Sequence, residues 1–92
     1  MFQIKLTPTA ARAFNRLHPE LKKQIKMVLK TLGEDPYSGK PLRNELSHFR
    51  SLKMKRYRAI YYPEDHSQRV VVVAIGHRRD IYDIATKIIS KE

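Results

Sequence analysis

Cysteine and tryptophan are missing from this sequence of 92 residues, and acidic residues are few, nine in all. Without cysteine the chain can form neither disulfide bonds nor thiolate metal sites, which fits a reducing compartment. No apolar stretch approaches the ~18 residues needed to span a bilayer. The N-terminal stretch MFQIKLTPT turns polar too early for a signal peptide. We therefore expect a cytoplasmic protein that does not contact a membrane.

The length of the chain suits one small domain. Residues 1–92 leave no room for a second domain or a long linker, so we expect a single domain over the whole chain. Hydrophobic residues make up 41% of the sequence, which is enough for a small core without cross-links.

Positive charge is the strongest compositional signal. Nineteen Lys and Arg residues against nine Asp and Glu residues give a formal net charge of +10. A charge of this size favours a polyanionic partner, although solvated lysine-rich helices are the plain alternative. Residues 43–58, RNELSHFRSLKMKRYR, hold six Lys or Arg side chains, one Glu and two aromatic rings, which is typical of a nucleic-acid surface. From the basic residues of this half of the chain we predict RNA contacts by His48, Arg50, Lys55, Arg56 and Arg79.

The N-terminal third of the chain has one strand pattern followed by two helix patterns. Residues 2–6, FQIKL, alternate apolar and polar side chains as a half-buried strand does. The Thr-Pro pair at residues 7–8 is typical of a helix start, and the His-Pro pair at 18–19 predicts its end and the start of a second helix. That second helix keeps apolar residues at helical spacing until Gly33.

The remainder of the chain changes to strand periodicity. Residues 52–62, LKMKRYRAIYY, predict a hairpin whose tight turn lies near residues 55–56. A two-residue turn favours residues that tolerate positive φ, so a Lys-Arg pair there predicts a turn that is either strained or longer. Residues 69–75, RVVVVAI, predict a central strand buried on both faces and ended by Gly76. Isoleucines at helical spacing predict a last helix over residues 81–89.

The order of these elements is strand, two helices, three strands and a helix. It predicts an α+β fold, with an antiparallel-dominated sheet of about four strands, two N-terminal helices packed against one face, and a C-terminal helix.

Together these pieces resemble the RelE/ParE superfamily of type II toxin-antitoxin toxins, in particular the RelE-like mRNA interferases. The resemblance covers residues 2–89 and rests on DPYSGKPLRNEL, LKMKRYRAIYY, VVVVAI and GHRRDIY in that order. It implies a RelE-like microbial RNase fold and a RelB-like antitoxin that holds the toxin inactive. It also implies an endoribonuclease that cleaves mRNA in the ribosomal A site and thereby inhibits translation.

The chemistry of RNA cleavage can be compared directly with the residues present. Attack by the RNA 2′-OH needs a base, an acid for the leaving 5′-oxygen, and cations for the pentacoordinate phosphate. Acidic residues are scattered along the chain and no histidine pair has metal-ligand spacing. We therefore expect a metal-independent mechanism without a cofactor.

Five residues are candidates for this chemistry. Alternation along YRAIYY puts Arg58 on the face opposite Tyr57, where it can share a site with Lys53 and bind phosphate oxygens with its planar fork. Arg78 follows the central strand, where two arginines near a helix start oppose the helix dipole and so suggest another use for their charge.

The other two candidates are His77 and Tyr82. Histidine is the side chain that most readily exchanges a proton near neutral pH, so His77, and also His48, could serve in proton transfer. Tyr82 falls outside the isoleucine stripe of the last helix, so its ring can stack on a base or its hydroxyl can move a proton. The resemblance implies a catalytic role at Arg58, a catalytic or substrate-orienting role at Tyr82, and a basic active-site position at Lys53 and at His77; Arg78 is predicted to be catalytic from its place after the central strand.

Two other functions remain open. ParE-like relatives share the fold but inhibit DNA gyrase by binding, without RNase activity, and they generally lack the set formed by Lys53, Arg58, Arg78 and Tyr82. A plain RNA-binding or ribosome-associated module is the third reading. The presence of the complete set favours the nuclease.

Overall fold

The two N-terminal helices begin where the sequence predicts. The computed structural model describes residues 1–90, so the last two residues of the predicted domain lie outside it. Thr7 caps α1 (Pro8–Asn15), because its hydroxyl accepts a hydrogen bond from the backbone N–H of Ala10 at 3.2 Å. His18 caps α2 (Pro19–Glu34) in a similar way, with Nδ1 accepting from the backbone N–H of Glu20 at 3.3 Å.

Five strands form one sheet in the order β1-β5-β4-β3-β2. The sequence predicts about four strands, and the additional one is the two-residue β2. Only β1 and β5 pair in parallel, and the other pairs are antiparallel. Their bounds are β1 Gln3–Leu6, β2 Lys40–Pro41, β3 Arg50–Met54, β4 Tyr57–Glu64 and β5 Arg69–His77. A short 3-10 helix, η1 (Asn44–Leu46), connects β2 to β3.

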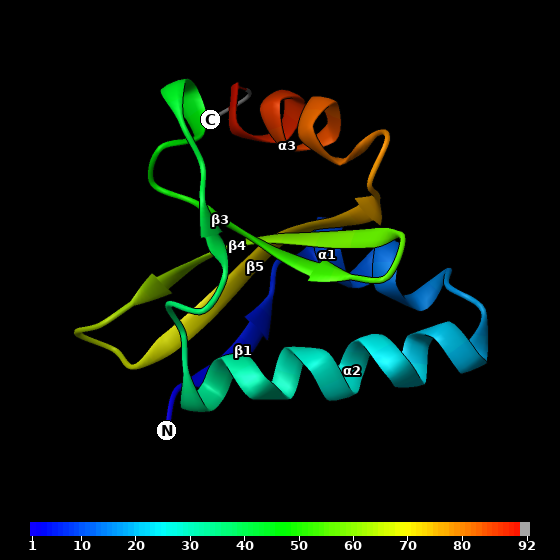
Figure 1. Ribbon diagram of the computed structural model, residues 1–92, viewed down its shortest axis with the longest axis horizontal. Coiled ribbons are helices and arrows are strands. Elements are labelled where there is room, and N and C mark those ends of the chain that lie inside the picture. The colour runs from blue at the N-terminus through cyan, green and yellow to red at the C-terminus, as the bar shows by residue number, and fades with distance from the viewer. Residues whose placement is uncertain (91–92) are drawn as a thin grey trace.

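Helices cover both faces of this sheet. Figure 1 shows the strands between α2 on one side and α3 (Ile81–Ser90) on the other. One buried cluster lies between the sheet and the pair α1 and α2, and a second lies under α3. The predicted α+β layer, with both N-terminal helices on one face, is confirmed. No helix within residues 1–90 has the length and apolar character that a membrane crossing requires.

An extra residue in β5 shifts its alternation. Ile60 of β4 pairs with Ala74, but the next residue, Tyr61, pairs with Val72. Val73 is therefore a bulge, and both Val73 and Ala74 pack in the cluster under α3. In a regular strand, every second residue after Val72 would point to the same face as Val72. Because of the bulge, each residue of β5 after Val73 points instead to the face opposite to the one that this alternation gives.

The hairpin between β3 and β4 has a two-residue turn. Met54 pairs with Tyr57, so only Lys55 and Arg56 remain between the strands. Lys55 has φ 60°, whereas Arg56 is not among the positive-φ residues. Positive φ at the first central residue alone is the type II′ pattern, which glycine normally supplies. Of the two predicted alternatives, the short turn with an unfavourable φ is the one observed.

Gly76 is predicted to end the central strand, but it lies within β5. β5 continues through Gly76 to His77. A Cβ at Gly76 would lie 3.3 Å from Cδ1 of Ile81 and 3.4 Å from Cδ1 of Ile84. The prediction that Gly76 ends the strand is wrong: its missing side chain instead allows the start of α3 to pack closely on β5.

Candidate functional site

A hollow of about 450 Å³ lies on the α3 face of the sheet. It brings together Lys53, Arg58 and Tyr82, three of the five residues predicted to be catalytic. We term it the Lys53 hollow. The residues that line it come from the loop before β2, from β2, β3 and β4, and from the first turn of α3: Ser38, Gly39, Lys40, Ser51, Leu52, Lys53, Arg58 and Tyr82.

Two cations of this hollow come from neighbouring strands. Lys53 on β3 pairs directly with Arg58 on β4, so both side chains leave the same face of the sheet. The Nη1 atom of Arg58 donates to the carbonyl oxygens of Lys55 at 3.0 Å and Tyr57 at 2.8 Å. These bonds hold the guanidinium beside the hairpin turn. Gly76 is the neighbour of Arg58 on β5 and adds no side chain above it.

Tyr82 completes the hollow from α3. It is the second residue of that helix and keeps 42% of its surface exposed. Its hydroxyl lies 3.4 Å from Oγ of Ser51, which is buried on β3. The ring is therefore accessible from solvent, while the hydroxyl is anchored to the sheet by a long hydrogen bond.

The hollow continues beyond Tyr82. A second depression of about 420 Å³ shares Lys40 and Tyr82 with the first and is otherwise lined by Pro41, Leu42 and Arg43. We term the two together the basic groove. Lys40 and Ser51 are not among the predicted site residues, although Lys40 belongs to the loop DPYSGKPLRNEL on which the resemblance rests. Lys40 reaches the groove because it pairs with Ser51 across β2 and β3.

Arg50, predicted to contact RNA, is already engaged within the protein. Its Nη1 atom donates to the carbonyl oxygens of Tyr37 at 3.0 Å and Gly39 at 2.8 Å. Its guanidinium carbon also lies 5.0 Å from the centre of the Tyr37 ring, in a cation-π arrangement. The contacts that Arg50 makes are those of a residue that ties a loop to the sheet.

His77 lies on the face of the sheet opposite Lys53 and Arg58. It pairs with Tyr57, which packs against the cluster beneath α1 and α2, and the two rings meet edge to face at 5.6 Å. Its Nδ1 atom accepts a hydrogen bond from the backbone N–H of Arg79 at 3.2 Å. The structure does not bring His77 to the Lys53 hollow.

The remaining predicted residues lie at the exposed end of the β3–β4 hairpin or in other exposed turns. The backbone N–H of Arg78 donates to the carbonyl oxygen of Arg56 at 2.7 Å, so both arginines and Lys55 lie at one end of the sheet. All three are exposed, as are Arg79 and His48, and none of the five lines either part of the basic groove. Lys55, Arg56, Arg78 and the adjoining Arg79 form a basic rim at the hairpin end of the sheet rather than a wall of the hollow, whereas His48 precedes β3 and lies at the other end of that strand.

Residues 4–82 match the family model described as the ParE toxin of the type II toxin-antitoxin system parDE. The chain belongs to the RelE/ParE toxin family. It is 34% identical over 83 residues to the toxin RelG of Mycobacterium tuberculosis, covering 88% of this chain and 95% of that protein. It is 32% identical over 83 residues to the toxin RelE of the same organism, covering 88% and 86%.

Solved structures agree with this assignment. The toxin-antitoxin complex RelBE2 from M. tuberculosis contains a chain that superimposes with a TM-score of 0.78 at 29% identity, covering 83% of this chain and 96% of that chain. The isolated RelE toxin of E. coli superimposes with a TM-score of 0.73 at 21% identity, covering 84% of each chain, which shows the shared fold. The predicted toxin family and fold are thus confirmed.

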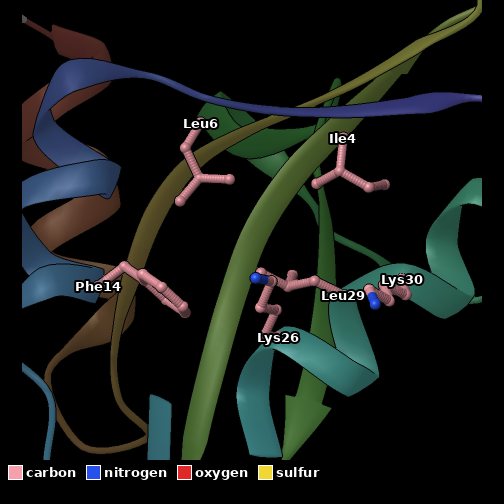
Figure 2. Close-up of a pocket in the computed structure, with 6 residues that line it drawn as sticks. All are labelled: Ile4, Leu6, Phe14, Lys26, Leu29 and Lys30. Atoms are coloured by element: carbon pink, nitrogen blue, oxygen red, sulfur yellow. The ribbon is translucent and has the colours of Figure 1, made fainter. Parts of the chain in front are cut away.

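The opposite face of this toxin carries a different kind of hollow. It has a volume of about 280 Å³ and lies between β1, α1 and α2. Figure 2 shows Ile4 and Leu6 directed toward Phe14 and Leu29, with the amino groups of two α2 lysines nearby. None of the residues predicted for catalysis lines it.

Neither the basic groove nor the hollow between β1, α1 and α2 gathers metal-binding side chains among the residues that the structure describes. Within residues 1–90, no three His, Asp or Glu side chains lie close enough together to hold a metal ion.

Proposed function

We propose that this toxin is an endoribonuclease that cleaves mRNA in the ribosomal A site and thereby inhibits translation. One observation carries the proposal: Lys53, Arg58 and Tyr82 line a single hollow although they come from three different elements. These residue types match what cleavage by the RNA 2′-OH requires, namely cations for phosphate and groups that can exchange a proton.

Arg58 stabilises the pentacoordinate phosphate in this mechanism. Its guanidinium is held at the hairpin turn by two backbone carbonyls, so it is oriented before the substrate arrives. A preorganised cation lowers the barrier because charge on the phosphate oxygens grows in the transition state. Lys53, directly across the strand pair, adds a second positive charge to the same place. Together, Lys53 and Arg58 supply the positive charge that stabilises the phosphate, so this mechanism needs no metal ion.

Proton transfer falls to Lys53 and Tyr82. They are the two residues of the hollow whose side chains, an amine and a phenol, are of the kinds that enzymes use as general acids or bases. Tyr82 is held near Ser51, and its exposed ring offers a surface on which a neighbouring base can stack. His77 takes no part in these steps because it lies on the other face of the sheet.

The partners of the toxin follow from its charge and its relatives. The solved complexes from M. tuberculosis and E. coli pair a toxin of this fold with a RelB antitoxin. We propose a RelB-like antitoxin with an acidic, partly disordered segment that orders on the basic groove and neutralises part of the +10 charge. The same groove and rim would face messenger RNA and the ribosome once the antitoxin is removed.

Mapping the 5′ ends of transcripts after induction of the toxin in cells tests the proposal. We expect new ends at fixed codon positions within translated frames. Intact transcripts together with gyrase-dependent DNA breaks would instead identify a gyrase inhibitor, the activity considered for ParE-like members. Ends that ignore reading frames would contradict cleavage in the ribosomal A site.

A further inference from the structure

The loop over residues 36–39 forms one wall of the basic groove. Ser38 and Gly39 line the Lys53 hollow. Lys40, which follows directly, lines both this hollow and the second depression of the basic groove. The position of this loop relative to the sheet therefore determines the width of the groove and the place of Lys40 in it.

Tyr61 holds this loop from inside the protein. The side chain is fully buried, and its hydroxyl donates to the carbonyl oxygen of Pro36 at 2.9 Å and accepts from the backbone N–H of Gly39 at 2.9 Å. Burial raises the pKa of Tyr61 above its ordinary value near 10, so the hydroxyl keeps the proton that it donates. One phenol thus fixes both ends of the four-residue segment 36–39.

Gly39 is the point of closest approach. A Cβ there would lie 2.5 Å from the hydroxyl oxygen of Tyr61 and 3.0 Å from the carbonyl oxygen of Ser51. Any side chain at Gly39 would push the wall away from β3, because the clash is partly with backbone and partly with a buried ring.

Two further contacts hold the outer side of the loop. Arg50 donates to the carbonyl oxygens of Tyr37 and Gly39, as described above. The hydroxyl of Tyr37 donates to Oδ2 of Asp65 in the β4–β5 turn at 2.5 Å. The wall is therefore tied to β3 through Arg50, to β4 through Tyr61 and to the β4–β5 turn through Asp65, although it has no regular structure before Lys40.

We infer that Tyr61 and Arg50 are positioning residues of the nuclease site, which set the wall of the groove and thereby the placement of Lys40 in the groove that Tyr82 also lines. This inference rests on the proposed function. Neither side chain lines the groove, so each acts through the loop. Small displacements of groups that orient a substrate lower the rate of the chemical step strongly.

The test compares Tyr61→Phe with Tyr62→Phe, the same substitution at the next residue. Tyr62 packs edge to face on Phe49 and lines neither part of the groove. Single-turnover cleavage of a ribosome-bound message is measured over a range of toxin concentrations. In Tyr61→Phe we expect the maximal rate to fall about tenfold or more, with the half-saturating concentration changed less than about threefold. Tyr62→Phe should keep both values.

Amide hydrogen exchange at Gly39 gives a second readout that does not depend on activity. It should speed up about tenfold or more in Tyr61→Phe and remain unchanged in Tyr62→Phe. Gly39→Ala leaves the core residue intact and should reproduce the loss of maximal rate. Arg50→Lys keeps the positive charge but loses the planar guanidinium that stacks on Tyr37, so it should lower the maximal rate if Arg50 positions the loop.

Three outcomes overturn the inference. The first is a parental rate in Tyr61→Phe, and the second is unchanged amide exchange at Gly39 in that variant. The third is full activity in both single variants Arg50→Lys and Gly39→Ala. Failure of the proposed function looks different, because the unsubstituted toxin and Tyr62→Phe would then both leave the message intact. Exchange at Gly39 would still decide whether Tyr61 holds the wall.

Discussion

Lys53 and Arg58 lie directly opposite each other on β3 and β4, and both line the hollow that α3 completes with Tyr82. Two cations at adjacent positions repel each other, which costs stability unless an anion lies between them. The arrangement is therefore better suited to binding phosphate than to holding the sheet together.

Replacing Arg58 by alanine separates chemistry from binding. Arg58→Ala should reduce single-turnover cleavage by about a hundredfold or more, because the lost charge acts mainly in the transition state. Ribosome binding should weaken only modestly, because many cations share it. Arg16→Ala, at an exposed arginine just after α1, is the control and should cleave normally. Parental cleavage by Arg58→Ala would show that this face is not the nuclease site.

Tyr82→Phe distinguishes the hydroxyl from the ring. A rate loss of about tenfold or more would assign proton transfer or hydrogen bonding to the hydroxyl, while a near-normal rate would assign stacking to the ring. We expect the loss. Ser51→Ala removes the partner 3.4 Å away and should lower the rate less than Tyr82→Phe does. An effect of Ser51→Ala that exceeds that of Tyr82→Phe would show that Ser51 acts other than through Tyr82, because both variants lose the hydrogen bond between them.

The hairpin turn offers a test of backbone strain. Lys55→Gly should raise the free energy of unfolding by about 0.5 to 1 kcal/mol, because glycine adopts φ 60° without the penalty that Lys55 bears. Arg56→Gly is the matched change at a residue without positive φ, and it should lower the free energy of unfolding by a similar amount. Chemical denaturation of both variants provides the measurement. A loss of stability in Lys55→Gly would contradict the assigned turn.

Alkaline pH should weaken the contribution of Tyr61. Burial raises its pKa in the folded state above the value near 10 in the unfolded chain. Below about pH 10 both states keep the proton, and above it the unfolded chain loses the proton first, so stability falls as pH rises.

Denaturation of the parent and of Tyr61→Phe at about pH 9 and about pH 11 measures this effect. At the lower pH the variant should be less stable by about 1 to 3 kcal/mol, because a buried donor and acceptor lose their partner. The gap should shrink at the higher pH. A gap that stays constant between the two pH values would show that the folded state does not favour the protonated phenol.

Gly76 links the sheet to α3. Gly76→Val should lower both stability and cleavage, because a branched side chain would meet Ile81 and Ile84 and move the helix that carries Tyr82. Gly76→Ala is the milder control, since the Cδ1 atoms that it would contact end flexible side chains. Thermal melting and single-turnover cleavage together provide the readout. Full activity in a stably folded Gly76→Val would mean that the close packing of α3 does not position Tyr82.

Much of the fold could be predicted because it depends on local signals. Capping residues and prolines set the starts of α1 and α2, and alternation placed Arg58 on the face of Lys53. Tyr82 could be assigned to the exposed side of α3 because helical spacing separates it from the isoleucine stripe. Each of these features depends on neighbours within a few residues along the chain.

By itself, the sequence determined the helix starts, the hairpin, the positive charge and the family of this toxin. Tertiary structure alone decided which face His77 occupies, because the bulge at Val73 changes the alternation of β5 and leaves no mark in the sequence. It also decided the contacts of Arg50, whose side chain meets a loop that lies 11 to 13 residues earlier in the chain. Long-range contacts of this kind depend on where the sheet brings distant segments together, which local patterns do not specify.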